Sequence, residues 1–145
     1  MEQSTDTRMT PAAHPFDERI LATLLVSLPD LQAVHRYGSA GGIYEREDSD
    51  IDLALLAAHP LTLAEKLQLA AKLSRLTGRN VDLNDLRSLP VTLRVQIVMQ
   101  GVRLYAKSIP AAEEYDSRAL SGYVRLNEER RGILDDIRRR GSIHG

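Results

Sequence analysis

The sequence contains no cysteine and no tryptophan, and only 4% of its 145 residues are aromatic. Without cysteine the chain cannot form a disulfide, a thiolate zinc site or a cysteine nucleophile, so a reducing cytoplasm is the expected location. Scarce aromatic residues argue against a stacking platform for single-stranded nucleic acid. No apolar run approaches the ~20 residues that a membrane-spanning helix needs, so we expect no membrane partner.

An excess of charge of either sign is also missing, because 19 basic residues face 20 acidic ones. A formal net charge of -1 argues against binding to DNA or to an anionic membrane by bulk charge, although a local basic groove stays possible. We therefore expect no direct nucleic-acid partner. The length suits a single domain, so we expect one folded core.

Apolar periodicity predicts a small α/β (α+β) domain, in which a mixed β-sheet is flanked by helices. Residues 1–14 lack a periodic pattern and predict a flexible tail, and residues 15–110 predict the main domain. Residues 111–145 predict a charged helical extension with a break near Gly122. The expected helices span residues 16–28, 62–77 and 90–100, and the expected strands span 31–37, 50–57, 80–86 and 102–107.

Two aspartates lie two residues apart at the start of the strand predicted over residues 50–57. Asp50 and Asp52 therefore project from one face of that strand, while Ile51 and Leu53 project from the other. Two carboxylates this close repel each other, and a divalent cation removes the repulsion. Oxygen ligands favour magnesium or manganese over zinc. The alternative is a solvated acidic loop, continuous with the acidic residues of 45–48.

Asp82 is a third candidate ligand, because it lies between apolar Val81 and Leu83 in the next predicted strand. If that strand lies beside the first, the three carboxylates can hold two cations ~3.5–4 Å apart. Asp85 falls on the opposite face by alternation, and we expect it to begin the turn before Ser88.

Gly38 and Ser39 end the strand predicted over residues 31–37. A strand that ends in Gly-Ser and enters a helix presents free backbone N–H groups, which favour a phosphate. Glycine also lets the backbone approach a ligand closely. Taken alone the dipeptide is weak evidence, because many ordinary turns contain it.

Together, Gly38-Ser39, Asp50-Ile51-Asp52 and Val81-Asp82-Leu83 resemble the DNA polymerase beta nucleotidyltransferase superfamily. The short chain and the segment from Pro90 to Tyr105 look like its smallest branch, the minimal nucleotidyltransferase (MNT) antitoxins that are encoded beside HEPN-domain toxins. The resemblance covers roughly residues 16–107.

The resemblance implies a polymerase-beta-like fold and transfer of AMP from ATP to a tyrosine hydroxyl of the partner HEPN toxin, an RNA-cleaving protein that the modification silences. It also implies two Mg²⁺ ions held by Asp50, Asp52 and Asp82 as catalytic and metal-binding residues. Gly38 and Ser39 would bind the outer phosphates of the nucleotide.

The sequence departs from the superfamily after the Gly-Ser turn, where members often carry Gly-Ser-x-Ala-Arg-Gly and this chain has no arginine. Arg36, Arg46 or Arg79 could replace it, although the expectation for each is an ordinary surface arginine. Two other functions stay open, which are a nucleotidyltransferase for a small molecule such as an antibiotic, and a non-catalytic module that neutralises a toxin by contact. His14, His35, His59 and His144 show no metal-ligand spacing.

Overall fold

The computed structural model describes residues 14–38, 46 and 49–144. Its four strands form one mixed sheet in the order β3-β2-β1-β4, in which β1 is antiparallel to β2 and β4 while β2 and β3 are parallel. The mixed sheet predicted from the sequence is therefore confirmed. The strands are β1 (Ala33–Tyr37), β2 (Ile51–Leu56), β3 (Val81–Asp85) and β4 (Val102–Ala106).

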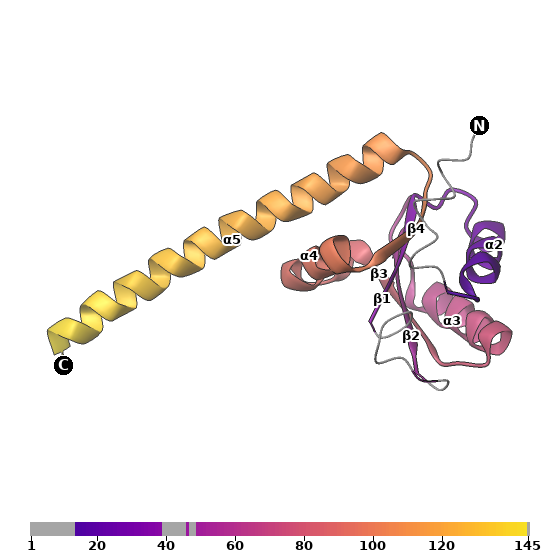
Figure 1. Cartoon of the computed structure of the whole chain (residues 1–145), viewed down its shortest axis with the longest axis horizontal. Helices are drawn as coiled ribbons and strands as arrows, with labels where there is room; N and C mark the ends of the chain where they lie inside the picture. The colour runs from indigo at the N-terminus through magenta and orange to yellow at the C-terminus, as the bar shows by residue number, and fades with distance from the viewer. Residues whose placement is uncertain (1–13, 39–45, 47–48, 145) are drawn as a thin grey trace.

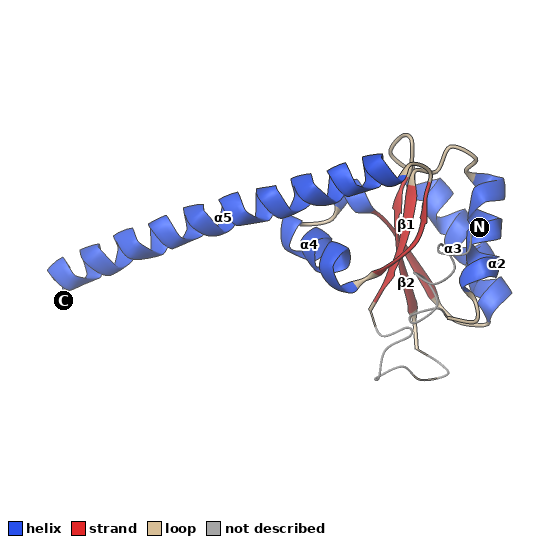
Figure 2. Cartoon of the chain, turned by 45° about the horizontal axis from the view of Figure 1, so that its top comes forward, coloured by secondary structure: helices blue, strands red, loops and turns tan. Residues whose placement is uncertain are grey.

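Helices cover both faces of this sheet (Figures 1 and 2). α2 (Asp17–Ser27) and α3 (Leu63–Thr77) lie on one face, and α4 (Val91–Gln100) lies on the other with the start of α5 (Ile109–His144). Alternation along β2 divides the core in two. Leu53 packs in the larger cluster beneath α2 and α3, whereas Ala54 packs in a smaller cluster that includes Ile97 of α4.

The ends of α3 are those that the sequence predicts. Thr62 and Glu65 form a reciprocal capping box, in which the Glu65 N–H donates to Thr62 Oγ1 (3.1 Å) and the Thr62 N–H donates to Glu65 Oε1 (2.8 Å). Gly78 ends the helix in the left-handed conformation, with φ of 72°. These local signals fix where α3 begins and ends.

The break expected near Gly122 is wrong, because α5 runs without interruption from Ile109 to His144. A glycine inside a helix costs about 1 kcal/mol, which weakens a long helix but does not end it. In Figures 1 and 2 the helix passes α4 and extends away from the sheet. Among the described helices, none combines the length and apolar character needed to cross a bilayer.

The predicted tail lies outside the described residues except for His14. This residue is buried, and its backbone N–H donates to Asp17 Oδ2 at 2.7 Å. The structure therefore includes His14 in the folded part of the chain, at the N-terminal end of α2.

Candidate active site

Asp52 and Asp82 are direct register partners in the parallel pair formed by β2 and β3. Their neighbours Ile51, Val81 and Leu83 are buried in the core on the other face of the sheet, as alternation predicts. Asp50 lies one residue before β2 and is exposed. The conditional expectation that the two strands are adjacent is therefore confirmed, and two of the three acids face each other.

Asn84 and Tyr37 complete this polar face, although the sequence analysis did not single them out. The Asn84 Nδ2 group donates to Asp82 Oδ2 at 3.0 Å and to the Tyr37 hydroxyl at 3.0 Å. Tyr37 is also the register partner of Asp52 on β1. Asn84 could have been found from its spacing, because a residue two positions after Asp82 shares its face.

The negative charges around Asp52 and Asp82 favour the binding of a cation. Burial raises the pKa of the Asp52 carboxyl, and the negative charges of Asp82 and Asp50 raise it further. Burial likewise raises the pKa of the Tyr37 hydroxyl, and the charges of Asp52 and Asp82 raise it further. The hydrogen bond from Asn84 lowers that pKa but does not cancel the increase. The ionised Asp52 carboxylate is thus destabilised unless a positive charge joins it.

The donor set fits Mg²⁺, because every candidate ligand is a hard carboxylate oxygen. Within residues 14–38, 46 and 49–144, however, no group of three or more histidine, aspartate or glutamate side chains could hold a metal ion by itself. Mg²⁺ is usually bound by one or two carboxylates together with water and substrate phosphates. The residues present therefore fit a cation that arrives with, or is completed by, a nucleotide.

Gly38 adjoins Asp52 directly. Its φ is +78°, a conformation that residues with a side chain rarely adopt. A Cβ atom at this position would overlap the Asp52 carboxylate oxygen and lie 3.2 Å from Asp52 Cγ. The structure thus brings the predicted glycine against a predicted acid, while Ser39 lies outside the described residues.

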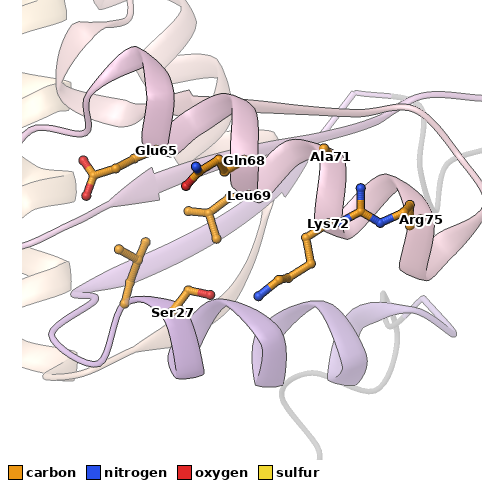
Figure 3. Close-up of a pocket in the computed structure, with 8 residues that line it drawn as sticks. Ser27, Glu65, Gln68, Leu69, Ala71, Lys72 and Arg75 are labelled. Carbon is orange, nitrogen blue, oxygen red and sulfur yellow. The ribbon is translucent and has the colours of Figure 1, made fainter.

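A cleft of about 550 Å³ contains all three aspartates. The cleft extends round the edge strand β3 to the flank of α3, where Leu63, Lys66 and Leu67 line it on the opposite face of the sheet from the Asp52 and Asp82 side chains. Another cleft of about 490 Å³ lies between α2 and α3, where side chains such as those of Lys72 and Arg75 line it (Figure 3). None of the three aspartates lines that second cleft, so it is not the candidate site.

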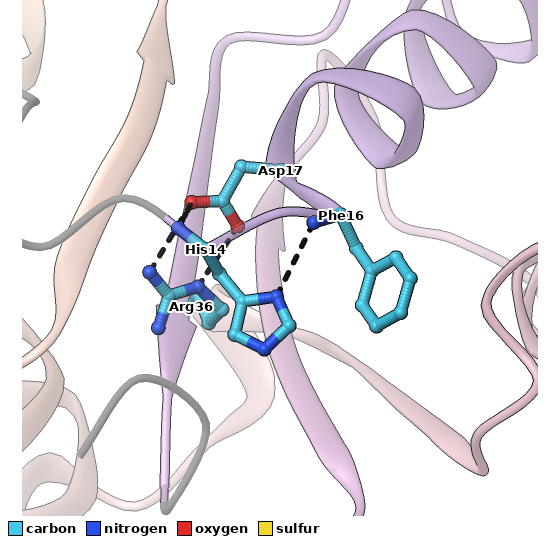
Figure 4. Close-up of polar contacts among 4 residues, drawn as sticks. All are labelled: His14, Phe16, Asp17 and Arg36. Atoms are coloured by element: carbon cyan, nitrogen blue, oxygen red, sulfur yellow. Dashed lines mark hydrogen bonds and ion pairs between the residues drawn. The ribbon is translucent and has the colours of Figure 1, made fainter. Parts of the chain in front are cut away.

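Arg36 is not the surface residue that the sequence predicts. Its side chain is 2% exposed, and Asp17 accepts hydrogen bonds from its Nε (2.9 Å) and its Nη2 (3.2 Å) (Figure 4). An arginine can be buried here because a carboxylate at the start of α2 compensates its charge. Arg46 is exposed as expected, and the partly buried guanidinium of Arg79 lies 5.4 Å from the centre of the Phe16 ring.

The remaining titratable candidates have structural roles. Asp85 Oδ1 accepts a hydrogen bond from the Arg87 backbone and begins the short 3-10 helix η2 (Leu86–Ser88), as predicted. His35 is buried on the opposite side of β1 from Arg36, and burial together with the positive charge of Arg103 lowers its pKa to about 4. It is therefore neutral at pH 7 and is separate from the acidic cleft.

Comparison with known proteins agrees with this geometry. The family model described as polymerase beta, nucleotidyltransferase matches residues 20–109, which include Gly38 and all three aspartates. This chain belongs to the polymerase beta nucleotidyltransferase family. The fold expected from the sequence is the family's fold, and Gly38, Asp52 and Asp82 lie at the adjacent ends of β1, β2 and β3.

Similar members of this nucleotidyltransferase family are antitoxins. The chain is 35% identical over 121 residues to the protein adenylyltransferase MntA of Shewanella oneidensis, covering 83% of this chain and 86% of that protein. A crystal structure of a toxin–antitoxin with AMP-PNP is 36% identical, with a TM-score of 0.73 over 83% of this chain and 97% of that one.

A second similar structure contains a tri-AMPylated Shewanella oneidensis HEPN toxin in complex with an MNT antitoxin. It is 35% identical, with a TM-score of 0.69 over 83% of this chain and 94% of that one. The resemblance to MNT antitoxins that the short motifs indicate is therefore confirmed, and it extends beyond the motifs to most of the chain.

Proposed function

We propose that this protein is the antitoxin of a HEPN/MNT toxin–antitoxin pair and that it transfers AMP from ATP to a tyrosine hydroxyl of its HEPN toxin. The observation that carries the proposal is the pairing of Asp52 with Asp82 in adjacent strands, with Gly38 packed against Asp52. The likeness to the Shewanella adenylyltransferase supports the choice of ATP and of a protein acceptor.

Asp50, Asp52 and Asp82 would hold Mg²⁺, with two ions as the family resemblance implies. When bound, Mg²⁺ supplies positive charge that offsets the phosphates and lowers the pKa of an attacking hydroxyl. The raised pKa of Asp52 supports this assignment, because a carboxylate that is destabilised alone gains most from a cation.

The protein's own contribution is to place the two reactants. The backbone at Gly38 and Ser39 would bind the outer phosphates, since glycine removes the side chain that would block their approach. Asp82 would lie on the acceptor side. A bond forms between the tyrosine oxygen and the α-phosphorus, the bond from that phosphorus to pyrophosphate breaks, and the hydroxyl proton is released.

In this proposal the chain has two parts with different roles. Residues 15–110 form the nucleotidyltransferase domain, and residues 111–145 form a helical extension, of which α5 is the described part. The reaction would take place in the cytoplasm, where ATP and magnesium are available to it.

A contact-only antitoxin is the second candidate. One observation favours it, which is that Gly41 and Gly42 occupy the region where related enzymes often carry an arginine after the Gly-Ser turn. The buried Arg36 cannot replace that arginine without leaving Asp17.

The deciding experiment combines the protein with labelled ATP, Mg²⁺ and its HEPN toxin and measures transfer of label to the toxin. We expect labelling by the wild type, a loss of roughly 10²-fold or more for Asp52→Asn and Asp82→Asn, and no labelling of a toxin whose acceptor tyrosine is phenylalanine. Asp30→Asn is the matched control, because Asp30 is an exposed acid whose side chain is 81% accessible.

Loss of labelling in the control would mean that the assay reports general surface charge. A wild type that binds the toxin tightly but never labels it would replace the proposal with the contact-only antitoxin. Wild-type labelling that survives both aspartate substitutions would place the catalytic metal site elsewhere.

A further inference from the structure

A pair of hydrogen bonds crosses the candidate site from β1 to β3. The Asn84 side-chain amide donates to the Tyr37 hydroxyl at 3.0 Å and to Asp82 Oδ2 at 3.0 Å. Tyr37 is the last residue of β1, and Asn84 follows Asp82 on β3. Because β2 lies between these two strands, the Tyr37 side chain crosses β2 to reach Asn84. The contact therefore joins the residue before Gly38 to the acid on the far side of Asp52.

The strand that Tyr37 crosses has a small side chain at this level. Ala54 is the β2 register partner of Asn84, and it shares a face of the sheet with Asp52. Ala54 is fully buried, and Tyr37 packs against the core cluster that contains it. Because the Ala54 side chain is a single methyl group, it leaves room above β2 for an aromatic ring. Packing against this cluster limits the positions that the Tyr37 hydroxyl can take.

The chemistry of the groups fixes the direction of these hydrogen bonds. An ionised carboxylate only accepts hydrogen bonds, so the Asn84 group that faces Asp82 is its NH2. This NH2 group has two protons, and the second is donated to the Tyr37 oxygen. Asn84 is therefore a bridge with one defined orientation, because Tyr37 fixes the amide and the amide fixes the Asp82 carboxylate.

We propose that Asn84 and Tyr37 are positioning residues that hold the Asp82 carboxylate in the orientation that AMP transfer needs, an inference that rests on the proposed function. Asp82 is exposed on an edge strand of the sheet, and an exposed side chain exchanges between rotamers unless a contact selects one. Hydrogen bonds to charged groups are among the stronger ones in proteins, so the Asn84 amide favours a single rotamer. Both residues act through Asp82.

The alternative is that the bridge has only a structural role, in which it satisfies polar groups and stabilises the edge strand. Water can satisfy an exposed carboxylate such as that of Asp82 without any side-chain donor. The bridge therefore contributes orientation to Asp82 more than it relieves an unpaired group. A structural role predicts a change in stability, whereas a positioning role predicts a change in kcat.

Steady-state AMP transfer to the HEPN toxin at saturating Mg²⁺ tests the bridge. We expect Asn84→Ala to lower kcat about 10- to 100-fold and Tyr37→Phe about fivefold to tenfold, with the KM for ATP changed less than about twofold. Because Tyr37 acts through Asn84, the double variant should match Asn84→Ala within about twofold. Tyr105→Phe is the matched control, because Tyr105 packs against the core cluster on the other face of the sheet, and it should retain the wild-type kcat.

Three kinetic outcomes overturn the positioning role. They are an unchanged kcat in both single variants, a change confined to the KM for ATP, and a double variant whose loss equals the product of the two single losses. Urea unfolding checks that each variant is folded in the assay. Tyr37→Phe removes one oxygen atom and retains the ring, so it decides the question if Asn84→Ala does not fold.

NMR of the side-chain amides tests the bridge in the metal-free protein without relying on catalysis. Asn84→Ala identifies the NH2 signals of Asn84 by their loss. We expect these signals to shift in Asp82→Asn and in Tyr37→Phe, because each substitution removes one acceptor of the amide, and to stay unchanged in Tyr105→Phe. Asn84 signals that respond to neither Asp82→Asn nor Tyr37→Phe overturn the bridge.

These measurements distinguish the positioning role from the proposed function. AMP transfer by the wild type with an unchanged kcat in the variants would retain the function and overturn the positioning role. Absent AMP transfer by the wild type would contradict the proposed function, and the positioning role would fail with it whatever the NMR signals show.

Discussion

Gly38 and Asp52 approach each other so closely that a single methyl group on Gly38 would overlap the Asp52 carboxylate. The contact joins the end of β1 to the start of β2, and it is possible only because Gly38 has a φ of +78° and no side chain. The turn proposed to bind phosphate and the acid proposed to bind metal are therefore one structural unit.

Substitution of this glycine should damage the site more than the fold. Gly38→Ala must accommodate both a left-handed backbone, at about 1–2 kcal/mol, and the overlap with Asp52. Gly78→Ala is the matched control, because Gly78 has nearly the same φ of 72° and nothing within 4 Å of an added Cβ. We expect similar backbone strain in both variants by urea unfolding, but loss of AMP transfer only in Gly38→Ala. Equal activity in the two variants would contradict the role of Gly38.

Removal of the Asp52 charge should stabilise the metal-free protein at neutral pH. Burial and the charges of Asp82 and Asp50 raise the folded-state pKa of Asp52. A raised pKa means that the folded state favours protonated Asp52. The contribution of Asp52 to the free energy of unfolding is therefore present at low pH and is lost as the pH rises through the folded-state pKa. Asp52→Asn should therefore unfold at higher urea concentration than the wild type at pH 7.

Mg²⁺ with AMP-PNP should reverse that order, because ligands that bind only the folded state stabilise it. We expect the unfolding midpoint of the wild type to rise on their addition and that of Asp52→Asn to change little. A variant that is stabilised as much as the wild type would show that the ligands bind away from Asp52.

His35 should make the protein sensitive to mild acid. Burial, and then the charge of Arg103, lowers its pKa from the usual 6.5 to about 4 in the folded state. As the pH falls from 6.5 toward 4, the unfolded chain binds a proton at His35 more readily than the folded chain does, so the free energy of unfolding decreases. The total decrease has a limit on the order of 3 kcal/mol. His35→Leu should remove this part of the pH dependence.

The measurement is the free energy of unfolding at pH 7.5 and pH 4.5 for both proteins. His35 Nδ1 has no hydrogen-bond partner among the described residues, so the leucine variant should retain its stability at pH 7.5. Identical pH profiles for the two proteins would exclude His35 as a source of acid sensitivity.

Breaking the buried ion pair between Arg36 and Asp17 should be costly. Asp17→Asn removes the carboxylate that accepts hydrogen bonds from the buried guanidinium of Arg36, and we expect a loss of about 3–5 kcal/mol. The control is Lys107→Ala at the exposed pair with Asp30, where the loss should stay below about 1 kcal/mol.

The double variant Asp17→Asn, Arg36→Met tests the cause, because it removes both charges and should recover part of the loss. Urea unfolding of the four proteins measures these differences. A double variant that is no more stable than Asp17→Asn would show that the geometry of the pair, and not the buried charge of Arg36, sets the cost.

Features carried by short segments could be predicted well. The alternation of Asp50 and Asp52 with Ile51 and Leu53 gives the correct faces of β2 because side chains project in turn to either side of any strand. Other features could not be predicted, such as the burial of Arg36, because the compensating charge of Asp17 lies 19 positions earlier in the chain. The uninterrupted α5 also differs from its prediction, since one glycine weakens a helix without dictating its end.

The sequence by itself determined which residues are candidates for the chemistry and which way the strand residues among them project, because periodicity, capping and glycine preferences act over a few neighbouring residues. Only the tertiary structure decided that Asp82 pairs with Asp52, that Gly38 contacts the same carboxylate, and that Tyr37 reaches Asn84 across β2. These are relationships between segments far apart in the chain, and strand pairing and helix packing, not local patterns, set the distances between them.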